Sequence, residues 1–146
     1  MRDATSTLRS TVATHVFPVR VYYEDTDSGG VVYYANYLKF AERARTEMLR
    51  SLRNGETNDG IAFVVRHCTA DFQKPARLDD LLDVETTVEE VGGASLVVDQ
   101  RVRRGSTELV HLVVRLAAVD SDGRPARLSP SLKAALAPTG AYTHRK

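Results

Sequence analysis

Residues 20–37, RVYYEDTDSGGVVYYANY, join a strand-like segment to the start of a long helical segment through a tight turn. The turn contains acidic side chains, among them Asp25 and Asp27, followed by the pair Gly29-Gly30. Backbone N–H groups at a helix start lack helical acceptors and carry partial positive charge. Glycine also lets the backbone approach a ligand closely. A carboxylate shortly before the helix can therefore lie across a bound carbonyl group from these N–H groups.

The segment at 34–52 has apolar residues at helical spacing, which predicts a long helix. Ala41 and Ala44 lie on its apolar face, and such small side chains let a helix lie close to a sheet. Strand patterns predominate further along the chain. Apolar and polar residues alternate over 82–89, and the glycine pair at 92–93 predicts a hairpin turn.

The predicted order is one strand at 16–23, the long helix, about four strands joined mainly by hairpins, and a short helix at 129–136. Hairpin connections imply antiparallel pairing. One helix packed on such a sheet is an α+β layer architecture. We expect a flexible Ser/Thr-rich leader at 1–15, a single domain at 16–137 and a flexible tail at 138–146.

Composition narrows the possible functions. With 20 basic and 19 acidic residues the formal charge is +1, which gives no support for nucleic-acid binding. No segment reaches the ~20 apolar residues of a membrane-spanning helix, so we expect no membrane span and a cytoplasmic protein. The single cysteine, Cys68, excludes an internal disulfide, and the four scattered histidines predict no metal site.

Residues 19–50, VRVYYEDTDSGGVVYYANYLKFAERARTEMLR, resemble the hotdog-fold acyl-CoA thioesterases of the 4-hydroxybenzoyl-CoA thioesterase family. The most similar type is YbgC, which is linked to the Tol–Pal envelope cluster and to lipid metabolism. Shorter matches are AFVVR at 62–66, PARLDD at 75–80 and SLVVDQRV at 95–102. The resemblance implies a curved five-stranded antiparallel sheet wrapped around the long helix. It also implies a homodimer with active sites at the subunit interface, and leaves open whether dimers pair into a homotetramer.

The resemblance also assigns roles to individual residues. The family's catalytic aspartate falls on Asp27, and its carbonyl-polarising backbone N–H falls on Tyr34. Relatives favour His or Phe at the second position, and a phenol is a poor base at neutral pH, so only the Tyr34 N–H is expected to act. We expect Gly30, Val31 and Val32 to contact the substrate.

Several other residues are predicted to have mainly structural roles. Phe63 and Val64 are predicted to be core residues first and walls of an acyl pocket second. Asp25 is expected to hydrogen-bond within the turn, and Tyr37 to pack against the sheet. From the residue pattern alone, Asp27 is equally consistent with a turn or helix-capping role.

Together these features predict hydrolysis of a fatty or short-chain acyl-CoA to the free acid and CoA. Asp27 would act as nucleophile or as the base that activates water, and the sequence does not choose between these routes. No cofactor is expected, because CoA is part of the substrate. One alternative is a non-catalytic hotdog scaffold that binds acyl carrier protein or lipid-synthesis enzymes. Another is a hydratase or dehydratase, although Tyr34 removes the obvious histidine.

Overall fold

The structure is a computed structural model that describes residues 13–53 and 60–137. Strand β1 (Thr14–Arg20) begins two residues earlier than predicted, so the end of the predicted leader at 1–15 belongs to the sheet. The rest of that leader and the predicted tail at 138–146 lie outside the described residues.

The chain leaves β1 through one turn of 3₁₀ helix, η1 (Tyr23–Asp25). The predicted first strand extended further, but the structure ends it at Arg20. The Tyr22 N–H donates to the Asp25 carboxylate at 2.8 Å, and this bond turns the chain before the strand-like pattern is complete. The difference matters because the turn that carries Asp27 begins here.

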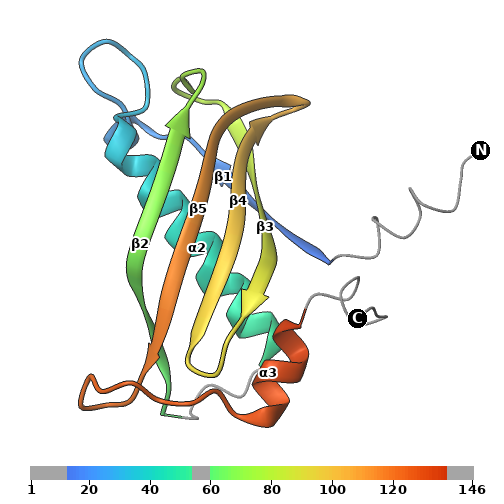
Figure 1. Ribbon diagram of the computed structural model, residues 1–146. Helices are drawn as coiled ribbons and strands as arrows, with labels where there is room; N and C mark the ends of the chain where they lie inside the picture. Colours follow the sequence, from blue (N-terminus) through green and yellow to red (C-terminus); the bar gives the residue numbers. More distant parts are fainter. Residues whose placement is uncertain (1–12, 54–59, 138–146) are drawn as a thin grey trace, which may run out of the picture.

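The remaining elements follow the predicted order. They are α2 (Tyr34–Leu52), β2 (Ala62–Phe72), β3 (Leu81–Val91), β4 (Ser95–Arg104), β5 (Thr107–Val119) and α3 (Pro130–Leu136). The strands form one antiparallel sheet in the order β1-β3-β4-β5-β2. Figure 1 shows α2 lying across one face of this sheet, with β2 at the sheet's edge. The predicted α+β architecture, one five-stranded antiparallel sheet with one long helix, is therefore confirmed.

The connection between β2 and β3 is not a hairpin. Strand β2 pairs with β5, while β3 pairs with β1 and β4. The chain must therefore pass from β2, at one edge of the sheet, past β5 and β4 toward the opposite edge before β3 begins. The residues that make this passage, 73–80, become available to contact the turn that carries Asp27.

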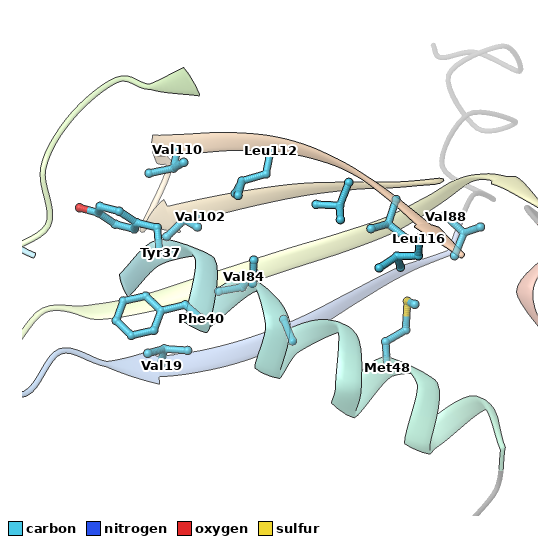
Figure 2. Packing of buried hydrophobic residues seen from close by; sticks show 14 of the residues in the cluster. Val19, Tyr37, Phe40, Met48, Val84, Val88, Val102, Val110, Leu112 and Leu116 are labelled. Carbon is cyan, nitrogen blue, oxygen red and sulfur yellow. The ribbon is translucent and has the colours of Figure 1, made fainter. Parts of the chain in front are cut away.

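Helix α2 packs on the sheet through Tyr37, Phe40, Ala41, Ala44 and Met48, each at most 5% exposed. Figure 2 shows the longer of these side chains pointing toward apolar residues of the strands. Both alanines are fully buried, as predicted, and their small side chains let the helix approach the strands closely.

Gln100 forms the polar centre of this helix–sheet interface and is fully buried in β4. Its amide nitrogen donates to the Ala41 carbonyl at 3.0 Å and to the Thr86 hydroxyl at 2.8 Å. Its amide oxygen accepts from the Arg45 guanidinium at 3.0 Å. Because buried polar groups require partners, these bonds favour one position of α2 on the sheet.

Replacing Gln100 with methionine tests this network, because Gln100→Met keeps the side-chain length but removes all three bonds. We expect the free energy of unfolding, measured by urea denaturation, to fall by about 1–3 kcal/mol. In the control Gln73→Met, only an exposed bond to Glu108 is lost, and stability should change by less than about 0.5 kcal/mol. Equal losses in the two variants would contradict a special role for the buried network.

Candidate active site

The segment between η1 and α2 forms a closed turn held by backbone hydrogen bonds. The Asp27 N–H donates to the Val31 carbonyl at 2.9 Å, and the Gly30 N–H donates to the Asp27 carbonyl at 3.0 Å. Gly30 has a φ of 82°, a left-handed conformation that favours glycine. The Tyr33 N–H donates to the Asp25 carbonyl at 3.0 Å. This last bond ties the end of the turn, where α2 begins, to its start.

Asp27 is exposed on this segment, residues 25–33, which we call the Asp27 turn. Its Oδ1 accepts from the Gly29 N–H at 2.8 Å and from the Val31 N–H at 3.4 Å. Asp27 therefore makes the contacts expected of a turn residue through one oxygen. Within the described residues, no hydrogen bond is made to the other oxygen, Oδ2. The carboxylate is held in place at one oxygen and open to a ligand at the other.

Helix α2 begins without a side-chain cap. Tyr33 occupies the N-cap position, its side chain accepts no bond from the first turn, and that turn holds no acidic residue. No acceptor in the described part of the chain is bonded to the Tyr34 N–H. Helix starts normally satisfy such groups with side chains, water or ligands. The start of α2 therefore presents an unpaired donor, at the positive end of the helix dipole, directly after the Asp27 turn.

Asp25 has the structural role predicted for it. Its carboxylate accepts from the Tyr22 N–H at 2.8 Å, and its carbonyl accepts from the Asn36 side chain at 2.8 Å. Asn36 lies in the first turn of α2, so Asp25 connects η1 to the helix through side-chain as well as backbone bonds.

The connection between β2 and β3 braces the Asp27 turn from the side. The Val32 N–H donates to the Ala76 carbonyl at 2.9 Å, and Val31 forms a β-bridge with Arg77. The Ala76 N–H donates to the Tyr37 hydroxyl at 2.8 Å. Tyr37 is buried, as predicted, and burial raises the pKa of its phenol, which keeps the hydroxyl neutral. Sequence reasoning missed this brace, although the PARLDD motif contains it.

Asp80 lies at the end of the same connection between β2 and β3 and holds it in place. Its carboxylate accepts from the Arg77 N–H at 2.9 Å and from the Arg104 guanidinium at 2.8 Å. Burial acts to raise the pKa of this carboxyl, but the Arg77 N–H and Arg104 together outweigh it and hold the pKa below its ordinary value. Asp80 is therefore charged at neutral pH and fixes the brace to β4.

Tyr37→Phe tests the brace, since it keeps the ring in the core and removes the acceptor of the buried Ala76 N–H. We expect a loss of about 1–3 kcal/mol in the free energy of unfolding, measured by denaturation. Amide exchange at Val32 should also become faster. The control is Tyr23→Phe, because the Tyr23 side chain is 80% exposed. If both variants are equally stable, the Tyr37 hydroxyl does not support the turn.

Exposed aromatic side chains surround the start of α2. Tyr33 and Tyr34 have ring centroids 4.8 Å apart, and the Tyr34 ring meets Phe72 of β2 edge-on at 5.9 Å. These three side chains are 47%, 60% and 46% exposed. Phe72 gave no signal in the sequence, because its contact with Tyr34 depends on where β2 lies in the sheet. The cluster provides an apolar wall beside the unpaired Tyr34 N–H.

A groove of about 540 Å³ lies between the C-terminal half of α2 and the first half of β2. Its lining includes Glu42, Arg45, Thr46, Leu49, Phe63, Val64 and Val65. Val64 is 43% exposed, so the prediction that it belongs first to the core is wrong, because β2 is an edge strand. Phe63 is half-buried and packs against the core from the groove.

The predicted site residues fall into two groups. Asp27, Gly30, Val31, Val32 and Tyr34 gather at the start of α2. The side chain of Val32 is only 4% exposed, and its N–H is taken by the brace. The other group comprises Phe63 and Val64 in the groove, which flanks the opposite half of the helix. One chain by itself does not bring the two groups together.

Two further findings concern other kinds of site. Within residues 13–53 and 60–137, no group of three or more His, Cys, Asp and Glu side chains is arranged to hold a metal ion. None of the described helices combines the length and apolar character needed to cross a membrane.

Comparison with known proteins identifies the class that this fold and site define. Residues 29–111 match the model of the thioesterase superfamily. The chain therefore belongs to the thioesterase superfamily. The predicted hotdog fold and membership in a family of thioester-hydrolysing enzymes are thereby confirmed.

Individual relatives refine the class. The acyl-CoA thioesterase YbgC of Haemophilus influenzae is 48% identical over 124 residues, covering 82% of this chain and 91% of that protein. The acyl-CoA thioester hydrolase YbgC of Escherichia coli O157:H7 is 49% identical over 98 residues, covering 65% and 73%. A probable thioesterase from Bartonella henselae superposes with a TM-score of 0.73 at 40% identity, covering 80% of this chain and 99% of that one. The predicted resemblance to the YbgC type is confirmed.

Proposed function

We propose that the protein hydrolyses acyl-CoA thioesters, with Asp27 and the Tyr34 N–H acting on the two sides of the thioester carbonyl. The observation that carries this proposal is the uncapped start of α2 directly after a turn with an exposed carboxylate. The names of the YbgC relatives support acyl-CoA as the substrate. The reaction requires no cofactor, since CoA is part of the substrate.

In the proposed reaction the thioester carbonyl oxygen accepts a hydrogen bond from the Tyr34 N–H, assisted by the helix dipole. A donor of this kind is worth about 3–4 kcal/mol of transition-state stabilisation. In one route an Asp27 oxygen forms a bond to the carbonyl carbon, and the C–S bond breaks with its electron pair leaving on the CoA thiolate. Water then hydrolyses the mixed anhydride. In the other route Asp27 removes a proton from water, and the resulting hydroxide attacks the carbonyl carbon. The C–S bond then breaks, and its electron pair leaves on the CoA thiolate.

Asp27→Asn is the direct test. Asparagine keeps the side-chain oxygen that accepts from the Gly29 N–H, so the turn should remain folded. We expect hydrolysis of acyl-CoA to fall by a factor of about 10²–10⁴, the usual contribution of a base in such a step. Tyr34→Phe should cost little, because only its backbone is used.

Asp122→Asn is the matched control, since Asp122 is another exposed aspartate and lies outside the Asp27 turn and the groove. Near wild-type turnover in Asp27→Asn, or an equal loss in Asp122→Asn, would refute the role of Asp27. Single-turnover hydrolysis in oxygen-18 water separates the two routes, because label in the Asp27 carboxylate requires the anhydride.

We further propose that the active unit is a homodimer joined along β2. Nearly every residue of β2 is exposed, and the strand is bonded on one side only. An unpaired strand edge is a template for a second strand. Antiparallel pairing about His67, the middle residue of β2, would set Phe63 of the partner subunit opposite Asp71. The partner's groove would then adjoin Phe72, which contacts Tyr34.

This arrangement supplies what one chain lacks. The turn and helix start of one subunit would meet the groove of the other, and the acyl chain would extend into that groove. Phe63 and Val64 would then serve as walls of the acyl pocket, while the aromatic cluster covers the reacting carbonyl.

The oligomeric state tests this part of the proposal. Sedimentation velocity should give a species of twice the chain mass. Cys68→Arg should yield monomers, because Cys68 lies near the middle of the exposed strand and beside Arg45. Two positive charges from each subunit would then meet where the two β2 strands pair. The control Val16→Arg, at the opposite edge strand, should stay dimeric. A monomeric wild type, or dissociation of both variants, would contradict pairing along β2.

The scaffold alternative predicts background turnover together with tight binding of acyl carrier protein. A hydratase would instead convert crotonyl-CoA without releasing CoA. The cytoplasmic location, the link to Tol–Pal and lipid metabolism, the acyl chain length and the pairing of dimers into tetramers remain predictions.

A further inference from the structure

A second cavity, of about 780 Å³, lies beside the first half of β2 and the end of β5. Arg115 lies between the buried residues Val114 and Leu116, so its side chain points to the face of the sheet away from α2. Arg115 pairs in register with His67, and both line this cavity. The cavity therefore opens on the outer face, whereas the groove described above lies on the helix side.

The charged side chains that line this cavity are all basic. Its lining contains three basic side chains, Arg66, His67 and Arg115, and no acidic one. Within the described residues, no carboxylate lies within ion-pairing distance of Arg66 or Arg115. Unpaired arginines facing one cavity are suited to binding an anion.

Other arginines of the sheet differ in this respect. Arg103 lies 2.8 Å from Glu85, and Arg104 lies 2.8 Å from Asp80. Their charges are already neutralised by neighbours, so a ligand phosphate would have to compete with a carboxylate. This contrast distinguishes the second cavity from an ordinary charged strand surface.

A β-bulge brings the basic side chains of β2 together in this cavity. The register of β2 with β5 shifts between Val65 and His67, which leaves Arg66 as the extra residue. Consecutive residues of a regular strand point to opposite faces, yet Arg66 and His67 both line the outer cavity. Bulges often re-aim side chains beside functional sites. Here the irregularity brings two neighbouring basic residues to one face.

The cavity adjoins the groove on the helix side, because Val64 and Leu116 line both. A CoA thioester has its acyl group at one end and a nucleotide with three phosphate groups at the other. Arginine binds phosphate oxygens through charge-assisted, often bidentate hydrogen bonds. The volume falls in the range of about 300–1,000 Å³ typical of small-molecule sites.

We propose that this cavity binds the 3′,5′-ADP end of CoA, with Arg66 and Arg115 as phosphate ligands and His67 beside them. The inference rests on the proposed function, since it extends the acyl-CoA site from the groove to the outer face of the sheet. The pantetheine arm would pass around the end of the sheet near the start of β2.

The experiment compares one acyl group on two carriers, CoA and pantetheine, the second of which lacks the nucleotide. Arg66→Gln and Arg115→Gln should each raise KM for acyl-CoA about tenfold or more, the loss expected of a charge-assisted phosphate contact. Both variants should leave kcat and the hydrolysis of acyl-pantetheine unchanged. The control Arg103→Gln should alter neither substrate. Calorimetric titration with 3′,5′-ADP should show binding to the wild type that both variants weaken.

The outcomes separate this inference from the proposed function. If the wild type hydrolyses both substrates equally well and does not bind 3′,5′-ADP, the nucleotide site is refuted and the thioesterase stands. If neither substrate is hydrolysed, the proposed function fails, and the ADP titration alone decides what the cavity binds. If the variants lose only the hydrolysis of acyl carrier protein thioesters and bind 3′,5′-ADP normally, an acidic protein occupies the surface and the proposal is overturned.

Discussion

The bonds from Asp27 N–H to the Val31 carbonyl and from Tyr33 N–H to the Asp25 carbonyl fasten a carboxylate-bearing turn to the start of α2. They fix the acid relative to the helix without using the carboxylate's second oxygen or the first helical N–H. The brace through Ala76 holds the turn from outside. The proposed chemistry depends on this arrangement, because it leaves an acceptor and a donor close together in the chain and without a partner among the residues that the structure describes.

The exposed edge of β2 has a different significance, because it concerns what a single chain lacks. The groove that could hold an acyl chain flanks the half of α2 remote from Asp27. Pairing two β2 strands antiparallel would join groove and turn from different subunits while satisfying the unpaired backbone groups of the edge. The same short stretch of β2 lines the groove on one face and the basic cavity on the other. A bulge in that stretch thus affects both ends of the proposed substrate site.

Local features could be predicted from the sequence, and distant pairings could not. The bounds of α2, the hairpins and the neighbourhood of Asp27 and Tyr34 follow from residues close in the chain, so patterns of spacing reveal them. The exposure of Val64 depends on β2 lying at the edge beside β5, a strand far away in sequence. The contact of Tyr37 with Ala76 and the bulge at Arg66 likewise arise only when the sheet forms. The spacing of apolar residues along the chain does not indicate such contacts between distant segments.

The central claim is that each active site takes its carboxylate turn from one subunit and its acyl groove from the other. Mixed dimers test it most directly. One chain carries Asp27→Asn, and the other carries Thr46→Trp, which fills the groove from an exposed position on α2 without altering β2. Each variant alone should be inactive, yet co-refolding equal amounts should restore about a quarter of wild-type activity, since random pairing makes half of the dimers mixed and each has one unaltered site. Mixed dimers that form but recover no activity would contradict the shared site.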